Sequence, residues 1–145
     1  MKWFLTLVVF SFSFAGYAQN NDLPKLSVSL AGFKGGATTS GILSRIIDSS
    51  IVARDEKGNT YTILRFRCIY KFKNRFEDPE TGEKKTTDDM RVNEFIQTPV
   101  MPETWRQSIK ENISKGDQMI LDDIIIQLKN GTKMMAPSVS FTILQ

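Results

Sequence analysis

The most constraining feature of the sequence is an alternation of side chains from Leu64 to Lys73. One parity is apolar and the other is mostly basic: Leu64, Phe66, Cys68, Tyr70 and Phe72 alternate with a row that contains Arg65, Arg67, Lys71 and Lys73. Successive side chains of a strand point to opposite faces of a sheet, so this period of two predicts a strand with one core face and one basic face. The chain is therefore expected to build a sheet.

Two further strands are expected in the N-terminal half. Residues 26–30 alternate apolar and small polar side chains, and the glycines that follow at 32, 35 and 36 end that pattern. Residues 50–53 form a short β-like piece that leads into the charged turn of residues 55–59. This piece and the alternating strand after the turn predict a hairpin.

The C-terminal half predicts more strands. Residues 92–96 form one, which ends before Pro99. From residue 120 onward an apolar row of one parity follows, in which Asp122 is the exception: Ile120, Ile124, Ile126 and Leu128. The pair Asn130-Gly131 is typical of a two-residue type I′ hairpin, and the returning strand would carry Val139, Phe141 and Ile143.

Two short helices and one long polar segment complete the pattern. A helix or turn is expected at residues 42–47, behind a capping side chain from residues 38–40. A second is expected after Pro102, with apolar residues at i, i+4 and i+8 from Trp105. Residues 74–91 are too polar to pack and should form a long loop or a protruding hairpin tip.

These elements predict a mainly β fold, an Ig-like β-sandwich with one or two short helices. Residues 19–145 have the length of one domain. The expected core residues are Leu64, Phe66, Tyr70, Phe72, Ile124, Ile126, Val139 and Phe141.

The N-terminus predicts export. Residues 1–18 have one positive charge at Lys2, an apolar run from Trp3 to Phe14 and small residues at Gly16 and Ala18, the pattern of a cleavable secretory signal peptide cut before residue 19. The mature chain contains no apolar run near the roughly 20 residues of a transmembrane helix. It is therefore expected to be periplasmic or extracellular.

Residue types restrict the chemistry. The chain has no histidine and one cysteine, Cys68, so histidine-dependent catalysis and the usual zinc sites are excluded, and we expect no metal site and no cofactor. The remaining candidates are the carboxylate pairs Asp88-Asp89 and Asp122-Asp123. If residues 119–128 are extended, Asp122 and Asp123 point opposite ways and cannot converge on one substrate. The favoured interpretation of this pair is a bulge or an exposed strand start without a catalytic role. A secreted carboxylate-dependent glycan hydrolase stays open as the alternative to a non-enzymatic role.

The basic row of Arg65, Arg67, Lys71 and Lys73 is the candidate binding face for an acidic partner or a glycan, and of these a protein partner is expected. Its alternative is a solvated face whose charges pair with acidic side chains on neighbouring strands. The net charge of +3 is too small to indicate nucleic acid or an anionic membrane as the partner.

Two segments resemble the C-terminal periplasmic domain of the gliding-motility and type IX secretion protein GldM, also called PorM. The similar features in residues 28–47 are Val28-Ser29-Leu30 and Gly35-Gly36. Those in residues 115–143 are Lys115-Gly116-Asp117, Leu121-Asp122-Asp123-Ile124, Asn130-Gly131 and the closing Pro137-to-Ile143 stretch. The resemblance implies a β-sandwich-like domain without catalytic residues that contacts a protein of the envelope or the secretion machinery. Full-length members of that family have an inner-membrane helix and further periplasmic domains, whereas this chain predicts one domain behind a signal peptide.

Overall fold

The computed structural model describes residues 23–144, so the predicted signal peptide lies outside the described residues. The elements in that range are β1 (Leu26–Leu30), β2 (Gly36–Thr38), α1 (Ser40–Ile46), β3 (Ile51–Asp55), β4 (Thr60–Glu77), β5 (Lys84–Ile96), α2 (Glu103–Asn112), β6 (Gln118–Gln127), β7 (Lys133–Ala136) and β8 (Val139–Ile143). The expectation of a mainly β, sandwich-like fold with one or two short helices is confirmed.

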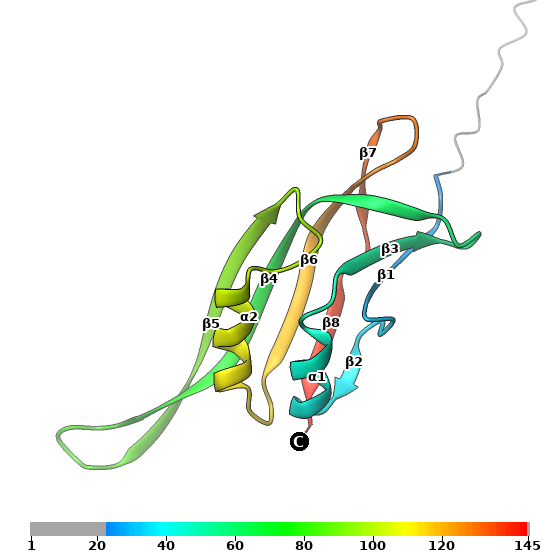
Figure 1. Cartoon of the computed structure of the whole chain (residues 1–145). Helices are drawn as coiled ribbons and strands as arrows, with labels where there is room; N and C mark the ends of the chain where they lie inside the picture. Colours follow the sequence, from blue (N-terminus) through cyan, green and yellow to red (C-terminus); the bar gives the residue numbers. More distant parts are fainter. Residues whose placement is uncertain (1–22, 145) are drawn as a thin grey trace, which may run out of the picture.

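The strands form one curled sheet in the order β1-β3-β4-β6-β8-β2, with β5 beside β4 and β7 beside β6 (Figure 1). All neighbours are antiparallel except β2 and β8. The 18-residue strand β4 connects the parts, because it pairs with β3 at its start, with β6 along its middle and with β5 from Arg65 to Glu77. The curl brings β1 into contact with β7.

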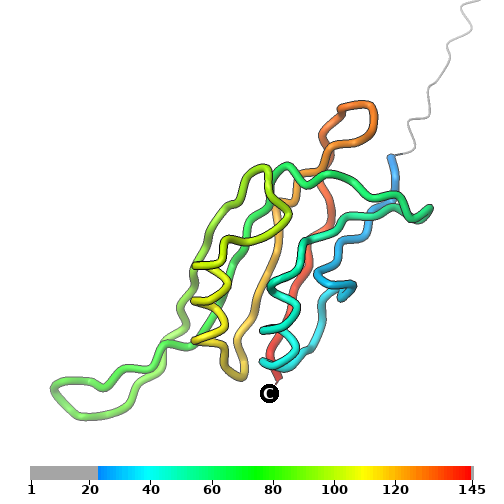
Figure 2. The backbone as a smooth tube through the Cα atoms, in the orientation of Figure 1, coloured from blue at the N-terminus to red at the C-terminus, as the bar shows by residue number. Residues whose placement is uncertain are grey.

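Both helices lie on the same side of this sheet (Figures 1 and 2). Leu43 and Ile46 of α1 and Ile109 of α2 are buried in the core with the inward side chains of the strands. Trp105 of α2 packs against Phe95 at 6.0 Å between ring centroids, and Phe95 packs against Phe66 at 5.1 Å. We call the helix side of the β5-β4-β6-β7 strands the covered face and the opposite side the open face.

Residues at the N-termini of the two helices explain where each helix begins. Thr39 caps α1 by accepting a hydrogen bond from the backbone N–H of Ile42, as the residue pattern predicted. The helix α2 follows Pro102 directly. Arg106 and Lys110 of α2 both donate to Asp48, just past α1, and these cations lower the pKa of the Asp48 carboxyl. No helix between residues 23 and 144 has the length and apolar character needed to cross a membrane.

The glycine-rich break after β1 has a packing reason. A Cβ at Gly35 would come within 2.6 Å of the Ser140 carbonyl oxygen on β8, and the φ of Gly35 is +100°. Glycine is therefore needed at position 35, directly before β2, where the chain comes close to β8 for their parallel pairing.

The expected core is confirmed at six positions and differs at two. Phe66, Tyr70, Ile124, Ile126, Val139 and Phe141 are buried. Leu64 is half-buried, because the pairing of β4 with β6 shifts between Ile63 and Arg65 and turns Ile63 inward instead. Phe72 is also half-buried and packs against the edge of the core.

A bulge in β6 changes the prediction for that strand. Met119 and Leu121 are buried in its first half, and Ile124 and Ile126 in its second half, so Ile120 is not part of the core row as expected. The parity changes at Asp122 and Asp123, where the pairing with β4 is irregular and Asp123 has a φ of 48°. The bulge that the sequence favours as the interpretation of the Asp122-Asp123 pair is therefore present. The opposite orientation expected of a fully extended strand does not apply, since the bulge removes the strict alternation.

The hairpin at Asn130-Gly131 exists but is not of type I′. Leu128 and Thr132 close a three-residue loop through a backbone hydrogen bond, and Gly131 has a φ of +84° while Asn130 is not in the left-handed region. This is typical of a three-residue hairpin with a bulge. The strand that returns from it is β7, and β8 instead pairs with the first half of β6.

The polar segment of residues 74–91 is mostly β structure. β4 continues to Glu77 and β5 begins at Lys84, so the loop covers only residues 78–83 and the two strands project together from the body (Figure 2). The hairpin alternative is therefore correct, and Asp88 and Asp89 lie in β5. Polar composition failed as a loop signal here because a two-stranded projection exposes both faces of its strands to water.

Candidate functional site

The register of β4 and β5 places the candidate basic row on the open face. The facing pairs are Arg65 with Ile96, Arg67 with Glu94, Ile69 with Val92, Lys71 with Met90 and Lys73 with Asp88. β6 and β7 extend this surface on the other side of β4, where Ile125 is paired with Met135. All four candidate residues thus share one surface.

The two arginines of that row are already paired within the chain. Arg67 binds Asp122 through two bonds, 2.8 Å from Nε to Oδ1 and 2.9 Å from Nη2 to Oδ2. Arg65 Nη2 donates to Asp123 Oδ2 at 2.8 Å, and its Nη1 lies 3.9 Å from Glu94 Oε1. The bond to Asp122 raises the pKa of Arg67. For the arginines, the structure matches the alternative of charges paired with acidic side chains on neighbouring strands.

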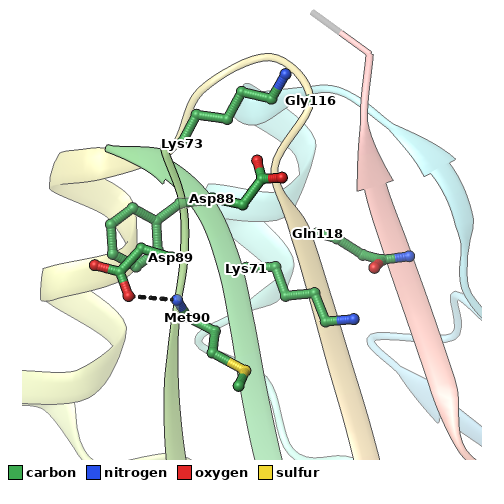
Figure 3. A pocket seen from close by; sticks show the side chains of 8 residues that line it. Lys71, Lys73, Asp88, Asp89, Met90, Gly116 and Gln118 are labelled. Carbon is green, nitrogen blue, oxygen red and sulfur yellow. Dashed lines mark hydrogen bonds between the residues drawn. The ribbon is translucent and has the colours of Figure 1, made fainter. Parts of the chain in front are cut away.

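The two lysines of the row differ from the arginines. Lys71 and Lys73 are exposed and form no ion pair with another residue between 23 and 144. They line an open hollow of about 580 Å³ together with Asp88, Met90 and Gln118 (Figure 3). Positive charge available to a partner therefore lies at this end of the open face.

On β5 the row of side chains with more apolar residues lies on the open face, and the more polar row lies on the covered face. We call this arrangement the reversed polarity of β5. From residue 90 its open-face row carries Met90, Val92, Glu94 and Ile96, and the three apolar side chains are 60%, 49% and 67% exposed. Its covered-face row carries Arg91 and, beyond it, Asn93 and Phe95, of which only Phe95 is buried. β5 therefore turns its more apolar side to solvent, and Met135 on β7 adds a side chain that is 63% exposed.

Sequence reasoning missed this apolar surface. The available signal was the parity of residues 90–96, in which methionine, valine and isoleucine share one side. Taken alone, that parity indicates the core side of a strand. Only the pairing of Phe66 with Phe95 shows that the opposite side faces the core.

Arg91, on the covered side of β5, has contacts with both β4 and α2. Its guanidinium lies 5.2 Å from the centroid of the Phe72 ring and donates to Ser108 Oγ on α2. The positive charge of Arg91 is thus partly compensated by the face of the Phe72 ring and by the Ser108 hydroxyl. These contacts hold the covered side of β5 under α2.

The carboxylate pairs have structural partners. Asp122 and Asp123 lie on the same face as a result of the bulge, and each holds an arginine. In Figure 3, Asp88 and Asp89 extend to different sides of β5, and the Asp89 carboxylate accepts from the backbone N–H of Met90. In the described part of the chain no three of the histidine, cysteine, aspartate and glutamate residues gather to hold a metal ion.

Two titratable groups are buried beneath the covered face. Cys68 is fully buried, and burial raises the pKa of its thiol to about 12. The hydroxyl of Tyr70 donates to Asp117, which is 1% exposed and also accepts from the backbone N–H of Ser114. Burial is the main cause that raises the pKa of Tyr70. Both groups are enclosed by packing, so their role is structural.

Comparison with known proteins adds no assignment. The chain matches no protein-family model, and none of the curated proteins is significantly similar to it.

Proposed function

We propose that this chain is a non-enzymatic protein-binding module of the bacterial envelope. Its partner is a protein of the envelope or the secretion machinery, and the assembly belongs to gliding motility or type IX secretion, as the resemblance to the GldM C-terminal domain implies. The predicted signal peptide supports a location in the periplasm or outside the cell. The open face of the sheet is the surface that binds the partner.

The reversed polarity of β5 is the observation that carries this proposal. Met90, Val92 and Ile96 keep about half or more of their surface in water, although the covered side of the same strand lies under α2. Exposed apolar side chains gathered on one face are typical of interaction sites. Burying such a group yields about 25 cal/mol for each Å² removed from water, so a partner gains affinity there.

The charges of the open face indicate where a partner protein would carry its apolar and its acidic side chains. The two arginines lie beside three carboxylates, those of Asp122, Asp123 and Glu94, so the middle of the face has no excess positive charge. Lys71 and Lys73 leave positive charge at one end. A partner that carries an apolar strip with acidic side chains beside it fits this pattern. Charged groups at the rim of an interface orient the partner more than they raise its affinity.

Site-specific photo-cross-linking in the bacterial envelope tests the proposal. A photoreactive side chain at Val92 or at Met135 is expected to give a discrete adduct with one protein, identified by its mass. The matched control is Ile42, a residue of α1 that is also exposed but lies on the helix side. Adducts of equal yield from Ile42 and Val92, or none from Val92 and Met135, would refute the open face as the binding surface.

A charge variant tests the orientation of the partner. Replacing Lys71 and Lys73 by glutamine should lower the yield of the Val92 adduct and flatten its dependence on salt. The control pair is Lys57→Gln with Lys129→Gln, two exposed lysines that line a different hollow. If both double variants have the same effect, the lysines of the open face do not orient the partner.

A further inference from the structure

β5 leaves one of its two edges without a partner strand. Among residues 23–144, β5 pairs with β4 along its whole length and with nothing on its other side, and it is the outermost strand in Figures 1 and 2. All of its thirteen residues except Phe95 are exposed. A free edge of this length offers a row of N–H and C=O groups to another strand, and proteins normally cover or blunt such edges.

Two side-chain contacts show which residues direct their backbone groups to that edge. The N–H of Met90 donates to Asp89 Oδ1 at 2.7 Å, and the N–H of Glu94 donates to Asn93 Oδ1 at 3.0 Å. In an antiparallel ladder, residues that face one neighbour alternate with residues that face the other. The even-numbered residues of β5 therefore direct their backbone groups to the free edge.

We propose that a second copy of this chain binds this edge, β5 against β5, antiparallel about a two-fold axis at Met90. This goes beyond the proposed function, since it needs no external partner. Met90 is the central residue of β5, so this register is the one that pairs the strand over its full length. Each even-numbered residue then meets an even-numbered residue, as a two-fold axis perpendicular to the sheet requires.

The charges favour the same register independently. With Met90 on the axis, Asp89 lies opposite Arg91 of the partner subunit, and Arg91 lies opposite Asp89 of the partner subunit, both on the covered side. A shift of two residues in one direction places Asp89 opposite its own copy, and the reverse shift does the same for Arg91. Opposite charges directly across a strand pair stabilise it and like charges destabilise it.

The hydrogen bond from the Met90 N–H to the Asp89 carboxylate can be replaced when the two β5 strands pair. On pairing, the N–H of Met90 donates to a backbone carbonyl of the partner strand, which releases the Asp89 carboxylate that now accepts it. The freed carboxylate is the group that faces arginine across the new pair. The two open faces then become one continuous surface, with the Met90 and Val92 side chains of both copies near its centre.

The test is sedimentation velocity of the exported chain over a range of protein concentrations. We expect a reversible dimer. Met90→Pro should shift the equilibrium to monomer, because proline removes the N–H at the centre of the edge. That N–H is directed away from β4, so the intrachain ladder keeps its bonds.

Charge reversal gives the matched controls. Asp89→Arg and Arg91→Asp should each weaken the dimer by about tenfold, because each creates two like-charge contacts across the axis, and the two changes combined should restore it. Circular dichroism checks that all variants keep their β structure. A chain that stays monomeric up to high micromolar concentration overturns the proposal. So does a dimer whose dissociation constant is unchanged by Met90→Pro or is not restored in the double reversal.

Discussion

The covered and open faces of the sheet are built by the same strands and differ in what lies over them. On β4, the covered face carries Phe66, Cys68 and Tyr70, all fully buried, and the open face carries half-exposed arginines and exposed lysines. On β5 the polarity is reversed. The comparison shows that the position of the helices decides which face becomes the core, and that a strand at the margin can place its apolar side on the outside.

The largest expected difference between the faces concerns aromatic packing. Phe66→Ala should lower the free energy of unfolding by about 3–5 kcal/mol, because it opens a cavity in a core that cannot fully collapse. Val92→Ala on the open face should change it by less than about 0.5 kcal/mol. Urea unfolding followed by circular dichroism measures both. Similar losses for the two variants would mean that the open face is packed in the isolated chain.

The buried hydroxyl of Tyr70 gives the next largest effect. Tyr70→Phe leaves the fully buried carboxyl group of Asp117 without that donor, and we expect a loss of about 1–3 kcal/mol. The same urea titration measures it. Tyr61→Phe is the control, since it removes a hydroxyl that donates to Asp55 at the part-buried β3–β4 turn. A smaller loss for Tyr70→Phe than for Tyr61→Phe would contradict the prediction.

The thiol of Cys68 gives a pH-dependent effect on the covered face. Its pKa is raised to about 12, whereas an unfolded thiol ionises near 9, so the folded state keeps a proton that the unfolded state loses. Stability is therefore fully present below pH 9 and falls as the pH rises toward 12. In Cys68→Ala the decline in the free energy of unfolding between pH 9 and 10 should be smaller by about 1 kcal/mol. Equal slopes in both proteins would show that the thiol is accessible in the fold.

The smallest expected effect lies on the open face. Arg67→Met removes the partner of Asp122 but keeps an aliphatic side chain, and the pair is partly exposed. The expected loss is about 0–1 kcal/mol, and part of it should be screened by salt. Unfolding at low and high ionic strength measures both quantities. A loss above 3 kcal/mol at high salt would mean that this pair belongs to the core.

Sequence reasoning predicted the parity of the strands where alternation is unbroken. The buried positions of Phe66, Tyr70 and Phe141 follow from the period of two, and the turn at residues 55–59 follows from its charges and glycine. The period of two no longer predicted which side chains are buried at the bulges in the β4–β6 pairing. The inward turn of Ile63 depends on which residues of β4 and β6 pair, and that information lies in two segments about 60 residues apart.

The candidate site was predictable only in part. The basic row was visible because its members alternate within one strand. The pairing of its charges with acidic neighbours was the stated alternative, but the particular partners were not predictable, because Arg67 meets Asp122 through a register set by the bulge in β6. The apolar side of β5 was missed because its exposure depends on α2 covering Phe95, a tertiary contact that local periodicity does not encode.

The bulge at Asp122 and Asp123 is the one place where β6 can change its length without exchanging inside and outside. Met119 and Leu121 are buried before it and Ile124 and Ile126 after it, with two outward residues between the two halves. Loss of Asp123 would restore strict alternation and leave Ile124 and Ile126 inward, at the cost of the acidic partner of Arg65. Loss of Ile125 would instead turn Ile126 outward, so over evolutionary time the length of β6 should vary at the bulge and stay fixed beyond it.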